Sequence, residues 1–310
     1  MTSLFKPSVM ITIALLALLP FVLPNNYMMD VAVRVALVAI AVIGLNLLMG
    51  FAGQISIGHA AFVAIGAYGS GIITSRYGWP ALPAIVGAAA GAVVVAWVIA
   101  KPILRLKGYS LTMATLGLGV IVNIVLINEV AWTGGPDGMP VPPLQVLGFT
   151  FAKITHWYAL AATLLVLAIV LSLNLFDSPC GRALRGLHGS EMAARVTGVD
   201  VAAFKVKAFV ASAVFATVSG SLTGHYLGFI SPSMAAFTQS VELATMVVLG
   251  GMGSTFGAVL GAALLTTLPQ VLGGFHDYEA IFFGLILMLT MMFLPRGVVP
   301  SLALKFMRRR

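Results

Sequence analysis

The sequence predicts an all-α integral membrane protein, a polytopic helical bundle of about ten transmembrane helices with broken helices and a short cytoplasmic helix. Three observations lead to this fold class. Hydrophobic residues make up 60% of the chain and charged residues only 8%, against about 25% charged residues in a soluble domain. Apolar runs of roughly the 20 residues that a helix needs to cross a bilayer follow one another along the chain. The basic residues gather at the ends of those runs.

The apolar runs define ten candidate spans along the 310 residues, namely 9–24, 31–49, 56–75, 81–100, 109–131, 158–176, 205–230, 236–250, 254–273 and 279–295. The first run could also be a signal peptide. The residues that follow it, Pro24-Asn25-Asn26-Tyr27, lack the small-residue cleavage site of such a peptide, so we expect an uncleaved span. Residues 1–310 are therefore expected to form a single transmembrane domain surrounded by lipid.

The distribution of basic residues orients the chain in the membrane. If the N-terminus is cytoplasmic, 14 of the 17 Lys and Arg residues fall on the cytoplasmic side. Only Arg34, Arg76 and Lys153 then fall outside. We therefore predict that both termini are cytoplasmic. The net charge of +8 lies at span ends and not on one soluble face, which argues against a nucleic-acid partner.

The longest predicted cytoplasmic connection, residues 177–204, is too polar for the bilayer and too long for a simple turn. Residues that begin helices alternate in it with glycines that end them, in the order Ser178 before Pro179, Gly189, Ser190, Gly198 and Asp200. We predict a helix from Pro179, a second from Glu191 to Thr197 and a third that enters the membrane near Lys205. The small residues Ala193 and Ala194 favour docking of the second helix on a partner, although an ordinary basic loop remains the alternative.

The external connection, residues 132–157, is rich in glycine and proline between Gly134 and Pro143. That composition is typical of turns and not of helix. We favour packing against the bundle as its main role, with some docking of an external protein.

Two glycine-rich segments interrupt the apolar chain, at 48–59 and 248–257. Their small and polar residues are Gly50, Gly53, Gln54, Ser56, Gly58 and His59 in the first, and Gly250, Gly251 and Gly253 in the second. Both segments place glycines three apart and then a hydroxyl, which indicates an internal repeat. Broken helices at corresponding places of two halves point to the substrate path of a transporter. Close helix packing through small residues is the alternative.

A few ionisable residues lie within the apolar runs, where charge is costly and usually functional. Glu242 is expected to face the bundle interior or a water-filled cavity, with a structural hydrogen bond favoured over contact with substrate. Glu129 lies close enough to an interface to reach water. We interpret His59 as a hydrogen-bonded packing residue in preference to a ligand.

The sequence contains no nucleotide-binding loop of the Gly-x-x-x-x-Gly-Lys-Ser/Thr type, no His-Glu-x-x-His and no Gly-x-Ser-x-Gly. The single cysteine, Cys180, excludes an internal disulfide and a metal site of several cysteines. An ion-coupled secondary transporter would carry paired acidic residues at the midplane, and a channel would carry a repeated pore loop. A multi-span chain with a docking helix and no energy source of its own instead indicates that a partner supplies the energy.

Several segments together resemble the permeases of bacterial ABC importers, and more narrowly the branched-chain amino acid permeases of the LivH/LivM type, above all the LivM branch. They occur in order at Gly44–Phe62, Leu104–Tyr109, Thr133–Gly138, Gly181–Gly198, Tyr226–Pro232, Val247–Ser254 and Pro295–Gly297. Two places depart from the family pattern. Val120 follows Gly119 where the family often has an acidic residue. Residues 187–190 are Leu-His-Gly-Ser, where the family usually has a more charged stretch.

The resemblance implies a permease subunit of the bacterial inner membrane that moves branched-chain or other hydrophobic amino acids by alternating access. Urea or short-chain amides are the alternative substrates. Implied partners are a second, LivH-like permease, two cytoplasmic ABC ATPases and an external solute-binding protein. The chain itself would bind no cofactor and catalyse no bond chemistry, because ATP and Mg would sit on the ATPases. The implied ATPase-coupling residues are Gly181, Arg182, Arg185, Glu191, Ala193, Ala194 and Gly198.

Overall fold

The computed structural model describes residues 7–22, 25–104, 106, 108–146, 149–271 and a few isolated positions between 284 and 301. Over these residues the chain is mainly helical. The α-helices are α1 (Pro7–Val22), α2 (Asn26–Asn46), α3 (Ala60–Tyr77), α4 (Ala81–Ile103), α5 (Tyr109–Asn128), α6 (Val130–Thr133), α7 (Ile154–Asp177), α8 (Pro179–Gly189), α9 (Glu191–Val196), α10 (Val201–Leu227), α11 (Phe237–Gly250) and α12 (Thr255–Val271). A π-helical turn η2 (Leu47–Phe51), two 3-10 turns η3 (Gly135–Asp137) and η4 (Pro232–Ala235), and the short strands β1 (Met139–Pro140), β2 (Gln145–Val146), β3 (Phe149–Thr150) and β4 (Phe229–Ile230) complete it.

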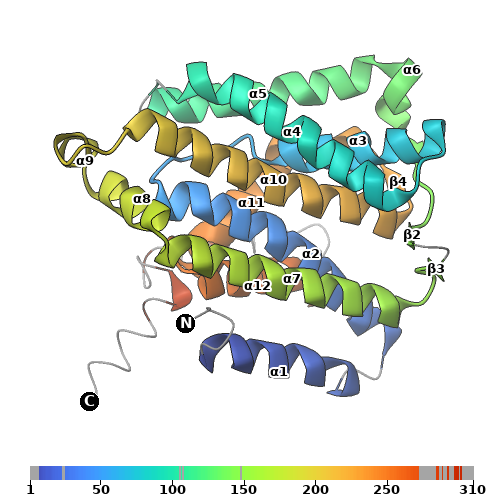
Figure 1. Cartoon of the computed structure of the whole chain (residues 1–310). Coiled ribbons are helices and arrows are strands. Elements are labelled where there is room, and N and C mark those ends of the chain that lie inside the picture. Colours follow the sequence, from blue (N-terminus) through green and yellow to red (C-terminus); the bar gives the residue numbers. More distant parts are fainter. Residues whose placement is uncertain are drawn as a thin grey trace.

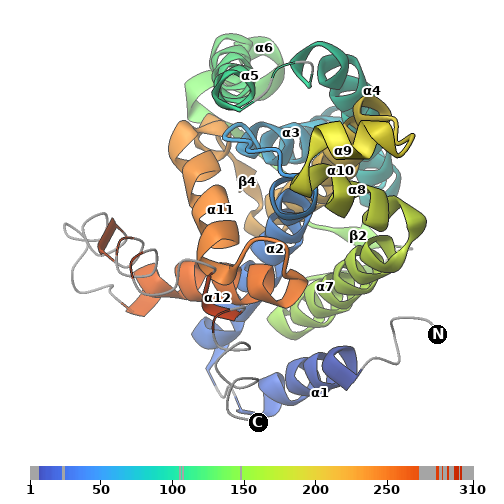
Figure 2. The same cartoon turned by 90° about the vertical axis from the view of Figure 1, so that its left-hand side faces the viewer.

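The long helices run roughly side by side as one bundle, with α8 and α9 at one end and the short strands at the other (Figure 1). An end-on view places α2 and α10 inside the bundle, α5 at one edge and α1 at the opposite edge (Figure 2). α10 packs on α2, α3 and α4, whereas α1 packs mainly on α7. The most apolar window of α2 is 78% buried and that of α5 only 22%. α2 is therefore a core helix, and α5 presents most of its surface outward.

Nine of the ten predicted spans coincide with a described helix, and the tenth, 279–295, lies outside the continuously described residues. Five helical segments are long and apolar enough to cross a membrane, namely 26–51, α4, α5, α7 and α10. The apolar helices α1, α11 and α12 are shorter. The mainly helical fold with several apolar helices is thus confirmed, while the count of about ten spans stays a prediction.

Three helices begin four or five residues before their apolar runs. α2 begins at Asn26, five residues before its run, and α7 and α10 begin at Ile154 and Val201, four residues before theirs. The side chain of Asp200 accepts a hydrogen bond from the Ala203 N–H and so fixes the start of α10. The predicted capping residue Asp200 sets the first turn of this helix, and hydropathy alone does not report it.

Close backbone contact joins α10 to α3. A Cβ atom on Gly66 would overlap the backbone of Thr217, and one on Gly220 would overlap the backbone of Val63. Small residues allow such close contact. In lipid the hydrophobic effect does not drive helices together, so the van der Waals attraction of this contact stabilises the pair. These contacts hold α3, which follows the first glycine-rich segment, against α10.

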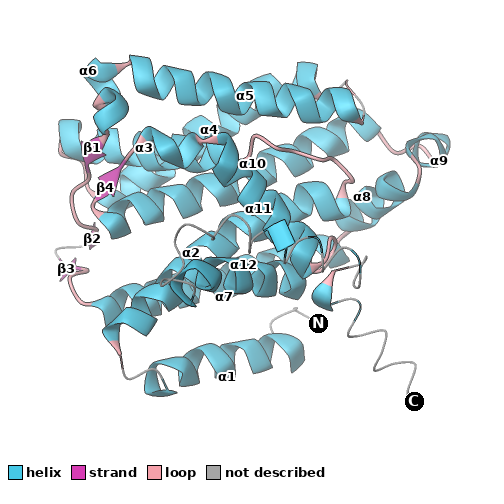
Figure 3. Cartoon of the chain, turned by 180° about the vertical axis from the view of Figure 1, so that it is seen from behind, coloured by secondary structure: helices cyan, strands magenta, loops and turns pink. Residues whose placement is uncertain are grey.

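The external connection packs on the end of α10. β1 pairs antiparallel with β4, with Met139 opposite Ile230, and the two strands lie together at one end of the bundle (Figure 3). A hydrogen bond of 2.9 Å joins His225 Nδ1 to the carbonyl oxygen of Pro142. β2 and β3 form a separate hairpin. The described part of 132–157 therefore packs as expected, and docking of an external protein there stays a prediction.

Candidate functional site

Three side-chain caps define the helices at the α8–α9 end of the bundle. Ser178 Oγ accepts a hydrogen bond from the Gly181 N–H at 3.2 Å, and Pro179 occupies the first helical position of α8. Ser190 Oγ accepts one from the Ala193 N–H at 3.3 Å and caps α9. Asp200 caps α10. The predicted helices and their caps are therefore present, because caps depend on residues only three positions apart.

One face of α9 is fixed to the rest of the chain. Ala194 is 4% exposed and packs in a small apolar cluster with Leu187 of α8 and Val201 of α10. The carboxylate of Glu191 also pairs with the ammonium group of Lys205, whose side chain is only 3% exposed. Ala194 thus serves packing within the chain and does not face outward, whereas the sequence grouped it with Ala193 as a contact surface.

The other face of α9 is open. Met192 is 71% exposed and Val196 83% exposed, and their spacing of four residues places them on one side of the helix. Ala193 is exposed beside them. Two large exposed apolar side chains on one side of a helix make this face a candidate contact surface. Sequence analysis selected Ala193 and missed Met192 and Val196, although their i, i+4 spacing was a usable signal.

α8 connects this surface to the membrane helices. Arg185 stacks over the ring of Phe176 in α7 at 4.1 Å, and that ring lies 4.8 Å from the ring of Phe51 in η2. His188 lies against Gly53, where an added Cβ would come within 3.0 Å of its Nδ1 atom. α8 therefore touches both the end of α7 and the first glycine-rich segment.

The remaining predicted residues of α8 and α9 act locally. Arg182 Nη1 donates to the carbonyl oxygen of Asp177 at 3.1 Å. A Cβ on Gly181 would overlap the carbonyl oxygens of Leu175 and Phe176, so glycine lets α8 begin against the end of α7. Gly198 follows α9 with a positive φ of 81°, a conformation that glycine adopts without strain.

The first predicted break is present in the structure. α2 passes into the π-helical turn η2, and the chain is then irregular until α3 begins at Ala60. Side chains satisfy two of the freed backbone N–H groups, as apolar surroundings require. Thr115 Oγ1 accepts from the Ile57 N–H at 3.2 Å, and Ser240 Oγ accepts from the Ala60 N–H at 3.1 Å.

The second predicted break lies between α11 and α12, and it contacts the first. The N–H of Gly253 donates to Asn46 Oδ1 at 2.9 Å. A Cβ on Gly50 would overlap the backbone of Gly253, so the two backbones touch. Gly250 packs in the same way on Gly257, and Gly251 turns the chain with a φ of 114°. The structure thus brings Gly50 and Gly253 together, about 200 residues apart in sequence.

Other predicted residues of the first segment are packing residues. His59 is 1% exposed, and its Nε2 lies 3.1 Å from Ser212 Oγ in α10. Gln54 and Ser56 are buried, and Gln54 Nε2 donates to the carbonyl oxygen of Ala52 at 3.1 Å. Gly58 packs against the backbone of Thr115. These contacts agree with the interpretation of His59 as a hydrogen-bonded packing residue.

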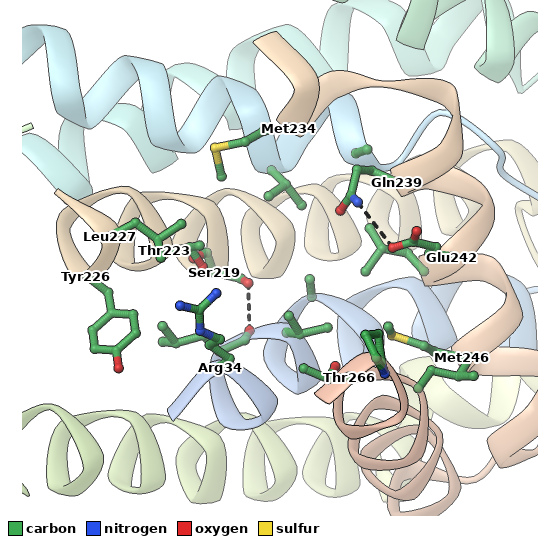
Figure 4. A pocket seen from close by; sticks show the side chains of 18 of the residues that line it. Arg34, Ser219, Thr223, Tyr226, Leu227, Met234, Gln239, Glu242, Met246 and Thr266 are labelled. Carbon is green, nitrogen blue, oxygen red and sulfur yellow. Dashed lines mark hydrogen bonds between the residues drawn. The ribbon is translucent and has the colours of Figure 1, made fainter. Parts of the chain in front are cut away.

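A cavity of about 280 Å³ is lined by residues of α2, α3, α10, α11, α12 and η4 (Figure 4). Glu242 lines it and accepts a hydrogen bond from Gln239 Nε2 at 3.1 Å. Arg34 lines it from α2. Sequence analysis placed Glu242 at such a cavity but treated Arg34 only as an external charge. Its position within the second apolar run was the signal that could have found it.

These features define a polytopic α-helical membrane protein whose broken helices meet beside a charged cavity, the arrangement of a transport protein. Comparison with known proteins then identifies the family. Residues 27–294 match the family described as "Branched-chain amino acid transport system / permease component", and the chain belongs to that family. The resemblance seen in the sequence motifs is thereby confirmed.

Named relatives agree with this assignment. The high-affinity branched-chain amino acid transport system permease protein LivM of Salmonella typhimurium is 34% identical over 300 residues, covering 87% of this chain and 69% of the relative. LivM of Escherichia coli K12 gives the same values. The permease protein LivH of Escherichia coli K12 is 28% identical over 280 residues, covering 84% and 90%. No solved structure matches the chain significantly. The chain is therefore a transport component and not an enzyme.

Proposed function

We propose that this chain is the transmembrane permease subunit of an ATP-driven ABC importer that moves branched-chain amino acids across the bacterial inner membrane. The observation that carries the proposal is membership of a branched-chain amino acid permease family over residues 27–294. The chain forms a single permease domain over residues 1–310. Its α8–α9 end and both termini face the cytoplasm, as the basic residues indicate.

The proposed partners follow from what this chain does and does not carry. A second, LivH-like permease completes the transmembrane part of the transporter, since permeases named LivM and permeases named LivH both align with this chain. Two cytoplasmic ATPases bind ATP and Mg, and an external solute-binding protein delivers the substrate. The exposed face of α9, with Met192, Ala193 and Val196, is the proposed docking surface for an ATPase.

Coupling needs a route from α9 into the membrane. The Glu191–Lys205 pair ties α9 to α10, and the stack of Arg185, Phe176 and Phe51 ties α8 to η2. The second route ends in the first glycine-rich segment, and α10 also packs on η2. We propose that ATPase movement displaces α8 and α9 together and separates Gly50 from Gly253, which opens the cavity toward the cytoplasm.

The test uses the transporter assembled with its partners in proteoliposomes. The wild-type assembly is expected to accumulate labelled leucine only with ATP. Ala193→Trp should keep insertion and pairing with the second permease but sharply reduce ATPase co-purification and uptake. Ala90→Trp, at an exposed alanine of α4 away from both proposed docking surfaces, is the matched control and should behave like wild type.

Two results would contradict parts of the proposal. Wild-type transport by Ala193→Trp would show that α9 is not the coupling element. ATP-driven uptake of urea or short amides without uptake of leucine would show that the substrate class is wrong and that the ABC mechanism is right.

A further inference from the structure

The cavity beside the glycine breaks carries opposite charges in an otherwise mainly apolar wall. Arg34 lies toward its Tyr226 side and Glu242 toward its Met246 side (Figure 4). Leu37, Val38, Leu243 and Met246 also line it. A cavity with two opposite charges and an apolar wall is chemically complementary to a zwitterion that carries a hydrophobic side chain.

Arg34 is positioned by its neighbours and remains able to bind an anion. Its Nε donates to Asp30 Oδ2 at 2.8 Å, and the hydroxyl of Tyr226 donates to the other oxygen of Asp30. Among the residues that the structure describes, no other hydrogen-bond partner of the guanidinium group is found. Its two terminal nitrogens can therefore form the bidentate contact that arginine makes with a carboxylate.

Glu242 is suited to bind the positively charged group of such a ligand. It lies in the second turn of α11, and Gln239 one turn earlier donates to it at 3.1 Å. An ionised carboxylate in a membrane helix is costly unless it faces protein, water or a ligand. The cavity supplies such surroundings, and an ammonium group there would form a charge-assisted hydrogen bond.

The contact between Asn46 and Gly253 lies beyond the inner end of the cavity. Along α2, cavity-lining positions run from Arg34 to Ala41, and Asn46 follows about 7 Å farther along the helix at 1.5 Å per residue. Asn46 holds the N–H of Gly253, where the two breaks touch. An occupant of the cavity is therefore separated from the α8–α9 end by the same contact that the proposed coupling movement opens.

We propose that this cavity is a binding site for the transported amino acid within the permease itself. Arg34 binds the α-carboxylate, Glu242 binds the α-ammonium group, and Leu37, Val38 and Met246 contact the aliphatic side chain. The inference rests on the proposed function for its substrate class. It assigns Glu242 to substrate contact, where the sequence alone favoured a structural hydrogen bond.

The experiment measures occupancy of the cavity directly. In a Cys180→Ser background of the assembled transporter, Val38→Cys is modified by a small water-soluble thiol reagent, with and without leucine. Leucine should slow the modification in a saturable way. Ala162→Cys lines a separate groove between α1 and α7 and is the matched control, on which leucine should have no effect.

Charge variants then test the two contacts. Arg34→Gln and Glu242→Gln should each raise the leucine concentration needed for protection by roughly 10- to 100-fold, as loss of a charge-assisted hydrogen bond predicts. Arg34→Lys and Glu242→Asp keep the charges and should retain part of the affinity. In the Val38→Cys protein, 4-methylpentanoate, which lacks the ammonium group, and isoamylamine, which lacks the carboxylate, should protect poorly.

The outcomes separate this inference from the proposed function. Equal protection by leucine and both analogues, or no protection in a preparation that imports leucine with ATP, would overturn the binding site and leave the importer function intact. Protection by leucine alone, in a preparation that does not transport it, would support the site and count against the importer function.

Discussion

Lys205→Met should weaken the attachment of α9 to α10 and uncouple the transporter while leaving the bundle folded. Lys205 is 3% exposed and pairs with Glu191, which is 26% exposed. Removing one partner of a fully buried pair costs about 3–5 kcal/mol, and an exposed pair is worth about 0–1 kcal/mol. A pair that is buried on one side and partly open on the other falls between these limits, at about 1–3 kcal/mol.

That energy acts on α9 more than on the whole protein. α9 has six residues, and its described anchors are this pair and the small cluster around Ala194. A loss of about 2 kcal/mol shifts the equilibrium between docked and released α9 by roughly 30-fold toward release. Hydrogen exchange at residues 191–196 should therefore accelerate by a factor of that order, while exchange in the middle of α10 stays unchanged.

The assay is a double-mutant cycle. Lys205→Met, Glu191→Gln and the double variant are compared by hydrogen exchange and by substrate-stimulated ATP hydrolysis. The cycle cancels the favourable interaction of Glu191 with the N-terminus of α9, which both Glu191 variants lose. Strictly additive effects, or unchanged exchange in Lys205→Met, would refute the reasoning that this pair holds the coupling helix.

Two further predictions concern the breaks and the topology. Gly53→Leu and Gly253→Leu should abolish uptake without preventing insertion, because both glycines have a positive φ that costs another residue about 1–2 kcal/mol, and both stand at the contacts described above. Gly91→Leu on the open face of α4 is the control, and wild-type uptake in either break variant would show that these glycines are incidental. Cysteines placed at Pro142 and Ser301 in a Cys180→Ser background should label from opposite sides of the membrane. Equal labelling of both from outside would reject the predicted topology.

Local features of this chain could be read from the sequence, because they depend on residues a few positions apart. Ser178, Ser190 and Asp200 cap α8, α9 and α10 as their spacing predicted. Hydropathy located the helices but placed the starts of the apolar runs of α7 and α10 four residues after the starts of the helices, since both helices begin before their apolar runs do. The number of spans depends partly on residues outside the described part and remains a prediction.

Long-range contacts could be read only in part. The repeated glycine pattern indicated two related breaks, but nothing in their spacing showed that Asn46 would hold Gly253, 207 residues away. Arg34 was assigned to the outside by charge counting, although its place in an apolar run was a second signal. Ala194 was grouped with Ala193, and only packing distinguishes the buried alanine from the exposed one.

The central claim, that α9 is the docking helix for an ATPase, can be tested most directly by site-specific photo-crosslinking. A photoreactive amino acid at Val196, which is 83% exposed, should crosslink to an ATPase subunit in the assembled transporter. The same group at Trp79, exposed between α3 and α4, should not. Absence of any ATPase adduct at Val196, in a preparation that hydrolyses ATP in response to substrate, would contradict the account.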